Sequence, residues 1–322
     1  MSHKRLLFLA IIPFLSLPSC SKSTSFIERT FSLSNDKWDI KLYDGATTDL
    51  YTLQSKMTRA YEISDSFAFS GTNNVFAINT AKNQAIAIDD DLKSLLTGAI
   101  SRSSLTLGYF DPLIGELVSL WDLALTNKKV PTNEEIASAL ENKKNTVLSI
   151  SSSSVTLSGD GLLDLGAIRK GYALSLCLTY LKSKGIKNYI VDAGGFDRLY
   201  GENPDDGNGK FSVTLSAFGG KKVSLKNSSI LTYSNYEDEV VVDGVTYASI
   251  INPKTGKNEF VSPVAVAIGD DSMSLDAISM VSSLLGEEGA KKFESTTYGS
   301  TISIILGDKD KVSYSSSSLA IS

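Results

Sequence analysis

The stretch "LLDLGAIRKGYALSLCL", residues 162–178, joins an apolar run to an amphipathic segment. The run predicts a short strand, Gly166 allows a tight turn, and the period of residues 169–184 predicts a helix that ends before Gly185. Arg169 and Lys170 open this helix, although the helix dipole favours anions at that end. The two cations therefore suggest an anionic ligand such as a phosphate. A solvated cation on an ordinary helix is the alternative, because no P-loop or GxGxxG pattern accompanies them.

The pattern of elements around this stretch predicts an α+β fold. Helices are expected at 48–64, at 91–107, after Pro131-Thr132 and near 274–285, and residues 25–43 alternate like a strand or hairpin. Further strands are expected at 146–150, 154–157, 188–195, 211–216, 221–225, 228–234, 240–251, 261–269 and in a hairpin over 301–316. Because strands follow one another instead of alternating with helices, α+β is favoured over a doubly wound sheet.

Composition excludes several kinds of chemistry. The 322 residues are 42% apolar, which supports a substantial core, and the formal net charge of −5 makes nucleic-acid binding unlikely to be the function. The only histidine is His3, near the N-terminus. The remaining chain therefore has no imidazole for a Ser-His-Asp triad, a zinc site or a histidine general base.

The N-terminus predicts export. Residues 1–19 have a short basic region followed by an apolar stretch, as in a secretory signal peptide. Leu17-Pro18-Ser19-Cys20 resembles a bacterial lipobox, in which Cys20 is lipidated; a signal cut nearby beside an incidental cysteine is the alternative. We expect a lipidated N-terminus and tether at 20–36, a domain at 37–322, and a location in the bacterial cell envelope, facing the periplasm or exterior.

Three further segments are candidates for a binding site. Paired glycines, Gly194 and Gly195, follow the strand at 188–193 and allow close approach of a ligand, although a plain turn explains them equally well. The "NPKTG" segment at 252–256 predicts a turn. Asp276 lies near a helix start, where it is either a simple first-turn acid or a ligand for a hard metal such as Mg²⁺.

Five segments in this order resemble the ApbE family, the FAD:protein FMN transferases. They are "FDPLIGELVSLWDL", "LDLGAIRKGYAL", "NYIVDAGGFDRLYG", "YASIINPKTG" and "DSMSLDAISMVSSLLG". The similarity spans roughly residues 37–310. The resemblance implies a T-fold-like architecture that binds FAD and Mg²⁺ and transfers FMN to a threonine or serine hydroxyl of a target protein, releasing AMP. Some members instead hydrolyse FAD to FMN and AMP.

The resemblance also implies roles for individual residues. Ala167 would offer a backbone carbonyl and Asp276 a carboxylate to the metal, and Lys170 and Asp276 would be the catalytic residues. The positions implied in binding the dinucleotide are Asp111, Gly166, Lys170, Gly194, Gly195, Ser249, Asn252 and Thr255. The implied partners are FAD, an exported or membrane-bound flavin-acceptor protein and, through the lipid, the membrane.

Several positions depart from the family pattern. Ser249 stands where members usually have histidine, and Met280 stands where they have threonine or serine four residues after the metal aspartate. Phe196 replaces the aspartate after the paired glycines, with Asp197 displaced by one, and Ser175 replaces an expected acid. Ser34-Asn35-Asp36 stands where members carry Met-Gly-Thr.

These departures leave more than one function open. The first hypothesis is a Mg²⁺-dependent flavin transferase on the outer face of the membrane. The second is a degenerate FAD-binding lipoprotein that holds the nucleotide without turnover. The third, a generic substrate-binding lipoprotein, does not explain the ordered set of motifs.

Overall fold

The computed structural model describes residues 24–67, 71–195, 197–236, 239–294 and 302–322. The predicted signal peptide at 1–19 and the predicted lipidation site Cys20 lie outside these ranges, as does Phe196. No helix within them is both long and apolar enough to cross a bilayer.

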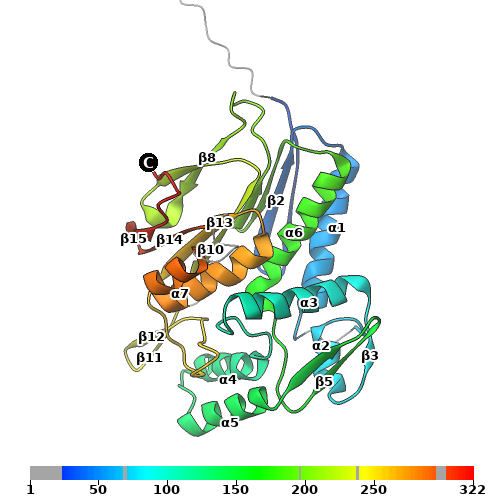
Figure 1. Cartoon of the computed structure of the whole chain (residues 1–322), viewed down its shortest axis with the longest axis vertical. Coiled ribbons are helices and arrows are strands. Elements are labelled where there is room, and N and C mark those ends of the chain that lie inside the picture. The colour runs from blue at the N-terminus through cyan, green and yellow to red at the C-terminus, as the bar shows by residue number, and fades with distance from the viewer. Residues whose placement is uncertain (1–23, 68–70, 196, 237–238, 295–301) are drawn as a thin grey trace, which may run out of the picture.

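An antiparallel eight-stranded sheet forms the centre of the molecule (Figure 1). Its strands, in spatial order, are β1 (Ile27–Leu33), β2 (Asp36–Leu42), β6 (Tyr189–Ala193), β7 (Asp197–Tyr200), β10 (Ser228–Ser234), β13 (Val264–Gly269), β14 (Ser303–Asp308) and β15 (Lys311–Ser315). Every neighbouring pair is antiparallel. The α+β prediction is therefore confirmed.

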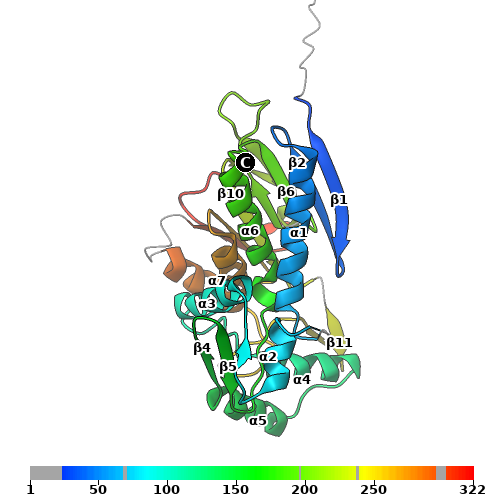
Figure 2. The same cartoon turned by 90° about the vertical axis from the view of Figure 1, so that its right-hand side faces the viewer.

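Three helices cover one face of this sheet. They are α1 (Thr47–Ser64), α6 (Arg169–Lys184) and α7 (Ser272–Glu294), and Figure 2 shows α1 and α6 side by side. Their apolar stripes pack on inward-facing strand residues such as Trp38, Ile40 and Val191, which are fully buried. Burial of this apolar surface is the main stabilising contribution to the layer.

The opposite face is covered by a smaller hairpin. Strands β8 (Phe211–Leu215) and β9 (Lys221–Leu225) pair with each other and bury Phe211, Val213 and Val223 against β10, β13 and β14. Strand β13 is buried along its whole length because both faces of the sheet are covered there.

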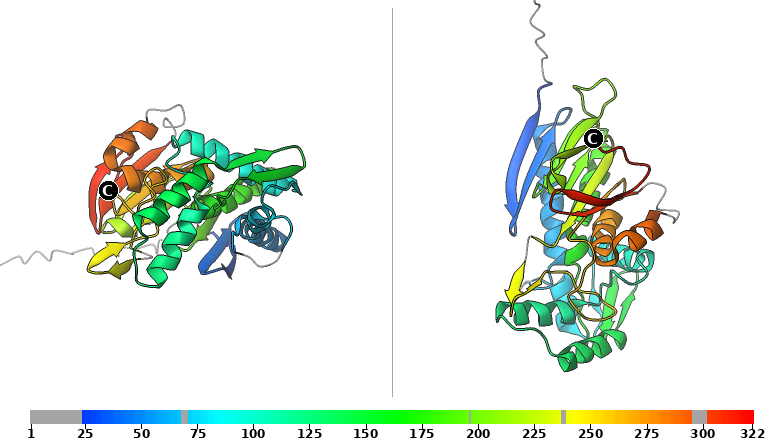
Figure 3. Two further views of the ribbon diagram at one scale, coloured as in Figure 1. Left: turned by 90° about the horizontal axis from the view of Figure 1, so that it is seen from below. Right: turned by 90° about the vertical axis from the view of Figure 1, so that its left-hand side faces the viewer.

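The remaining elements form a second layer at one end of the sheet. They are α2 (Val75–Ala81), α3 (Asp90–Leu105), α4 (Gly115–Thr126), α5 (Asn133–Lys144), the small sheet of β3 (Ile86–Ala87), β5 (Ser154–Ser158) and β4 (Val147–Ile150), and the hairpin of β11 (Val240–Val242) and β12 (Val245–Tyr247). Seen from below, α4 and α5 lie nearest the viewer (Figure 3, left). A separate core around Trp121 joins α4, α5 and the hairpin.

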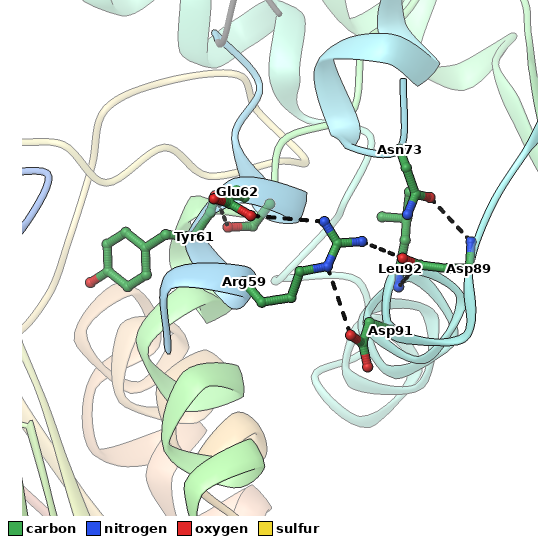
Figure 4. A network of polar contacts seen from close by, with 8 residues as sticks. Arg59, Tyr61, Glu62, Asn73, Asp89, Asp91 and Leu92 are labelled. Carbon is green, nitrogen blue, oxygen red and sulfur yellow. Dashed lines mark hydrogen bonds and ion pairs between the residues drawn. The ribbon is translucent and has the colours of Figure 1, made fainter. Parts of the chain in front are cut away.

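A polar network ties the second layer to α1 (Figure 4). The guanidinium of Arg59 on α1 binds the carboxylate of Asp89, and its Nε lies 3.7 Å from Asp91. Asp89 caps α3 by accepting the Leu92 N–H at 2.9 Å, and its own N–H donates to Asn73 at 3.1 Å. One cation thus fixes the start of α3 against α1.

The structure corrects several element boundaries. Strand β1 lies inside the segment 20–36 that is predicted to be the lipidated N-terminus and tether, because its backbone pairs with β2 along the whole strand. The predicted start of the folded domain at residue 37 is therefore too late. Residues 162–165 make only a single bridge, from Leu162 to Ile114, and not a strand. Segment 240–251 folds into the β11–β12 hairpin, and α7 continues past a break at Gly286.

Helices α6 and α7 touch at Gly171. A methyl group at this position would lie 2.4 Å from the carbonyl oxygen of Ser272 and 2.7 Å from Cβ of Asp276. Both neighbours belong to the first turns of α7, whose backbone cannot move away without disturbing the sheet beneath it. The absence of a side chain at Gly171 therefore sets the distance between the two helices that carry Lys170 and Asp276.

We expect Gly171→Ala to lower the free energy of unfolding by about 1–3 kcal/mol, because the new methyl group overlaps backbone atoms. The matched control is Gly98→Ala in α3, where the new methyl group meets the mobile end of the Met273 side chain. Alanine favours the helix by up to about 1 kcal/mol over glycine, so Gly98→Ala should be neutral or stabilising. Urea denaturation measures both, and equal stabilities would contradict this account of the helix contact.

Candidate active site

A cavity of about 330 Å³ opens where the sheet, α6, α7 and the second layer meet. Its lining combines charged side chains from the amino ends of β2, β7 and α6 with the aromatic side chains of Tyr109, Phe110 and Tyr233. The lining residues are Asp36, Tyr109, Phe110, Asp111, Ile114, Val118, Asp164, Gly166, Ala167, Arg169, Lys170, Asp197, Thr232, Tyr233, Ser234, Ser249, Ile251, Asp276 and Met280. Five of them are aspartates and only two are cationic, so the lining of the cavity is acidic.

Lys170, in the first turn of α6, is the cation at the centre of this acidic group. Its Nζ lies 3.0 Å from Oδ1 of Asp36 and 3.7 Å from Oδ2 of Asp197. Burial by itself would lower the pKa of the ammonium, but the nearby carboxylates of Asp197 and Asp36 outweigh it and raise the pKa above its usual value. Lys170 therefore stays charged in any solution near neutral pH.

Asp276 approaches the same group from α7. Its Oδ2 accepts the N–H of Gly171 at 2.7 Å, one of the first-turn donors of α6 that have no partner within the helix. Burial raises the pKa of the Asp276 carboxyl well above its usual range, and the negative charges of Asp197 and Asp36 act in the same direction. The Gly171 bond and Lys170 oppose this shift without cancelling it.

The other two carboxylates are held in place by hydrogen bonds. Asp197, which is buried at the start of β7, accepts the Thr232 N–H of the neighbouring strand at 2.7 Å. Asp36, at the start of β2, accepts the Tyr61 hydroxyl at 2.6 Å. Burial and the Asp36 carboxylate together raise the pKa of Tyr61, so the phenol remains a donor. Three carboxylates thus share one ammonium, and the group carries surplus negative charge.

The turn before α6 is a short 3-10 helix, Gly166–Ile168. The Asp164 carboxylate accepts the N–H of Gly166 and the hydroxyl of Ser66, both at 2.9 Å. Arg169 donates from Nε to the hydroxyl of Ser64 at 3.0 Å, so it points toward α1. Of the two cations at the helix start, Lys170 alone lies within the carboxylate cluster.

The second layer and β10 contribute further residues to the lining of the cavity. Asp111 is paired with Lys143 of α5 at 2.7 Å and accepts the Leu113 N–H at 2.9 Å. The Ser249 hydroxyl lies 3.1 Å from the Tyr233 hydroxyl. Asp111 therefore joins the cavity to α5, and Ser249 is exposed at its rim.

Most of the predicted site residues lie in this cavity, and some do not. Asp111, Gly166, Ala167, Lys170, Ser249 and Asp276 line it. Gly194 lies at its margin, with a Cβ there falling 3.9 Å from Nζ of Lys170, and Gly195 donates its N–H to Asp192 at 2.6 Å.

Asn252 and Thr255 lie outside the cavity lining. The Asn252 amide and the Thr255 hydroxyl both donate to Glu259, at 2.6 and 3.0 Å. These side chains brace the turn that ends at Gly256, whose carbonyl accepts the Trp121 indole N–H at 2.8 Å. Asn252 and Thr255 affect the cavity through the shape of this loop, because their polar groups form hydrogen bonds within the loop.

Two departures from the family pattern have a clear structural effect. Met280 lines the cavity together with Asp276, four residues earlier on α7. The neighbouring Ser279 is buried, and its hydroxyl donates to the Asp276 carbonyl at 2.9 Å, so it does not replace the missing hydroxyl. Ser175 donates to the Tyr172 carbonyl within α6.

Sequence reasoning did not single out Asp36, Asp164 or Asp197 as site residues. Asp36 stands in the segment where the Met-Gly-Thr pattern is lost, and Asp197 is the acid displaced by one after the paired glycines. Each of these two departures introduces an acidic residue. This was the signal in the sequence that could have identified Asp36 and Asp197 as site residues. Their convergence on Lys170 depends on the pairing of β2, β6 and β7.

The donor set suits a hard cation. Mg²⁺ takes oxygen ligands, often only one or two carboxylates with water completing its shell. The raised pKa of Asp276 and the excess of carboxylates over cations make this part of the cavity suitable for a hard cation. Ala167 lines the same cavity. Among the described residues no group of three or more histidine, cysteine, aspartate or glutamate side chains is arranged to hold a metal. Any Mg²⁺ here would therefore depend on Asp276, backbone oxygen and water.

Comparisons with known proteins show the family of this chain. The ApbE family model matches residues 35–302. The chain is 26% identical to the FAD:protein FMN transferase of Vibrio cholerae, covering 96% of both chains, and 25% identical to that of Haemophilus influenzae, covering 96% of this chain and 95% of the other.

Solved structures show the same fold. The ApbE protein from Thermotoga maritima superimposes with a TM-score of 0.75 at 24% identity, covering 92% of this chain and 96% of that one. The flavin transferase ApbE from Vibrio cholerae gives 0.71 at 21% identity, covering 91% and 98%. With the family model matching most of its length, this chain belongs to the ApbE family.

Proposed function

We propose that this chain transfers FMN from FAD to a threonine or serine hydroxyl of an exported target protein, in a Mg²⁺-dependent reaction that releases AMP. The observation that carries the proposal is the cluster of Lys170 with Asp36, Asp197 and Asp276 in a cavity lined by the family's motif residues. The names of the relatives support the flavin chemistry.

The reaction replaces the phosphoanhydride bond between the two phosphates of FAD by a phosphate ester bond to the acceptor. The acceptor hydroxyl oxygen bonds to the phosphorus of the FMN half of FAD, the bond from that phosphorus to the bridging oxygen breaks, and AMP leaves with the electron pair. The hydroxyl proton passes to a base. With no histidine in the described ranges, the aspartate carboxylates are the proton acceptors that this cavity offers.

The chain's own residues would bind and orient the diphosphate. The Lys170 ammonium is fixed beside the first turn of α6, whose positive dipole end also favours phosphate. The enclosing walls of Tyr109, Phe110 and Ile114 exclude water, which strengthens each charged contact. Asp276 and Ala167 would hold Mg²⁺, which when bound supplies positive charge that neutralises the phosphate oxygens.

We also propose that the protein is anchored in the cell envelope through a lipid on Cys20, which lies outside the described residues. A lipid anchor would place the cavity on the same side of the membrane as an exported acceptor. This part of the proposal rests on the residues preceding the folded domain. Radiolabelled palmitate incorporation that is lost in Cys20→Ala tests it directly.

The degenerate alternative is favoured by Met280 and Ser249, which place a thioether and an exposed hydroxyl where stronger functional groups are expected. One assay separates the two functions. Purified protein is incubated with FAD, Mg²⁺ and a threonine-bearing acceptor peptide, and AMP and peptide-bound flavin are quantified. We expect both products; FAD recovered intact would refute the transferase, and AMP without modified peptide would indicate hydrolysis.

Asp276→Asn should abolish Mg²⁺-dependent AMP release and, without Mg²⁺ and FAD, raise the melting temperature. Asparagine can still accept the Gly171 N–H but does not place an anion beside Asp197 and Asp36. A carboxyl with a raised folded-state pKa stabilises the protein most below its unfolded pKa, and this contribution is lost as pH rises through the folded pKa.

The stability advantage of Asp276→Asn should therefore grow from pH 4 to neutral pH. Thermal melts across this range, with and without Mg²⁺, measure it. The matched control is Asp192→Asn, since Asp192 pairs with Arg198 outside the cavity lining. A melting temperature for Asp276→Asn that falls at neutral pH would contradict the charge surplus inferred here.

Met280→Thr should increase Mg²⁺-dependent AMP release about fivefold, which corresponds to one additional hydrogen bond of about 1 kcal/mol. The new hydroxyl would lie on the same face of α7 as Asp276 and would be a better neighbour for a hard cation than a thioether. Met280→Leu preserves size without the hydroxyl and serves as the control. A rate increase in both variants would show that cavity shape and not the hydroxyl limits turnover.

A further inference from the structure

The β11–β12 hairpin rises from the rim of the cavity. It follows β10, whose Tyr233 and Ser234 line the cavity, and it leads back to Ser249, which also lines it. Its two-residue turn, Asp243-Gly244, has φ angles of 50° and 78°, both positive as in a type I′ turn. Figure 1 shows the hairpin at the side of the molecule, beside α4.

One face of the hairpin is packed and the other is open. Val242 is buried, and the Tyr247 ring lies 5.6 Å from the Trp121 ring of α4. On the outer face Val241 and Thr246 stand opposite each other and are exposed, Val241 by 57%. The hairpin is therefore held by α4 with an uncovered outer surface.

The backbone N–H and C=O groups of this exposed pair point away from the partner strand. In an antiparallel ladder, pairs that exchange hydrogen bonds alternate with pairs that do not, and a two-residue turn is flanked by a bonded pair, here Val242 and Val245. Val241 and Thr246 are consequently the non-bonded pair. Their N–H and C=O groups face the two outer edges of a sheet that has only two strands in the described part of the chain. Such an edge is a template for another strand.

The edge beside Thr246 leads to the reaction site. Ala248, two residues further on, faces the same edge, and its N–H donates to the Asn258 side chain at 3.1 Å while its carbonyl accepts from the same amide. Asn258 thus occupies the place that a neighbouring strand would take beside Ala248. A strand added at Thr246 would end against Asn258, next to Ser249 and the cavity.

The charge around the hairpin defines the chemistry of its partner. Between Lys226 and Lys254 the sequence contains no basic residue, and it carries four acids, Glu237, Asp238, Glu239 and Asp243. Glu239 and Asp243 are exposed at the two ends of β11. Both acids flank β11, so they lie roughly one strand spacing, about 5 Å, from β12 and its Thr246 edge. The negative charge of the hairpin attracts a positively charged segment and repels an acidic one.

We propose that the Thr246 edge of the β11–β12 hairpin is the docking site for the acceptor protein, which adds an extended basic segment as a third strand. Backbone hydrogen bonds to Thr246 supply affinity, the acidic residues select a basic sequence, and the strand's end places its hydroxyl beside Ser249 at the cavity. The identity of the partner as the acceptor rests on the proposed function, whereas docking of a basic strand does not require turnover.

The test uses a fluorescein-labelled synthetic peptide with one threonine flanked by alternating lysine and valine, and full-length protein. Fluorescence anisotropy measures its affinity for wild type, Thr246→Pro, Val241→Pro and Thr246→Ala. Proline removes one outward N–H without breaking the hairpin ladder. We expect Thr246→Pro to weaken binding about fivefold, which corresponds to the loss of one hydrogen bond of about 1 kcal/mol. Val241→Pro on the opposite edge and Thr246→Ala should bind as wild type does.

A second measurement avoids backbone changes. Glu239→Lys with Asp243→Lys should weaken peptide binding, added salt should weaken it in wild type, and a peptide with glutamate in place of lysine should bind less tightly. Melting temperature and FAD binding verify that each variant is folded. Equal affinity of all variants, no binding of the basic peptide, or loss in Val241→Pro alone would overturn the proposal.

The same protein preparations distinguish three other outcomes. Self-association that Thr246→Pro abolishes, without peptide binding, would assign the edge to a second copy of the chain and overturn the acceptor. Edge-dependent peptide binding without AMP release would support docking and refute the proposed transfer. AMP release and peptide modification that are insensitive to Thr246→Pro would support the transfer and refute the docking site.

Discussion

The site depends on one ammonium group shared by three carboxylates. Lys170 compensates Asp36, Asp197 and Asp276 only in part, and burial together with the neighbouring carboxylates raises the pKa of Asp276. Bringing several carboxylates together in a partly buried place has an electrostatic cost. A bound cation would offset this cost.

The fold supports this charge group through rigid elements. Lys170 and Asp276 lie in the first turns of two packed helices whose separation is set by Gly171, and Asp36 and Asp197 begin two strands of the central sheet. Sites built on helices and strands hold their side chains more precisely than sites on loops. The second layer, fixed to α1 by Arg59, closes the cavity from the other side.

The departures from the family pattern at Met280 and Ser249 change the lining of the cavity. Lys170 and Asp276, which match the pattern, line the same cavity. Asp36 and Asp197 add acids close to the positions where family residues are missing. The hairpin with its acids Glu239 and Asp243 extends the negative charge of the cavity toward the surface.

The sequence by itself determined the helix at 169–184 with its leading cations, the consecutive strands of an α+β fold and the order of the family's motifs. These features depend on periodicity, turn residues and composition, all carried by neighbouring residues. Only the tertiary structure decided that Asp36 and Asp197 meet Lys170, that Asn252 and Thr255 serve their loop, and that residues 240–247 form a free-edged hairpin. Those outcomes follow from strand pairing between distant segments, which local patterns do not specify.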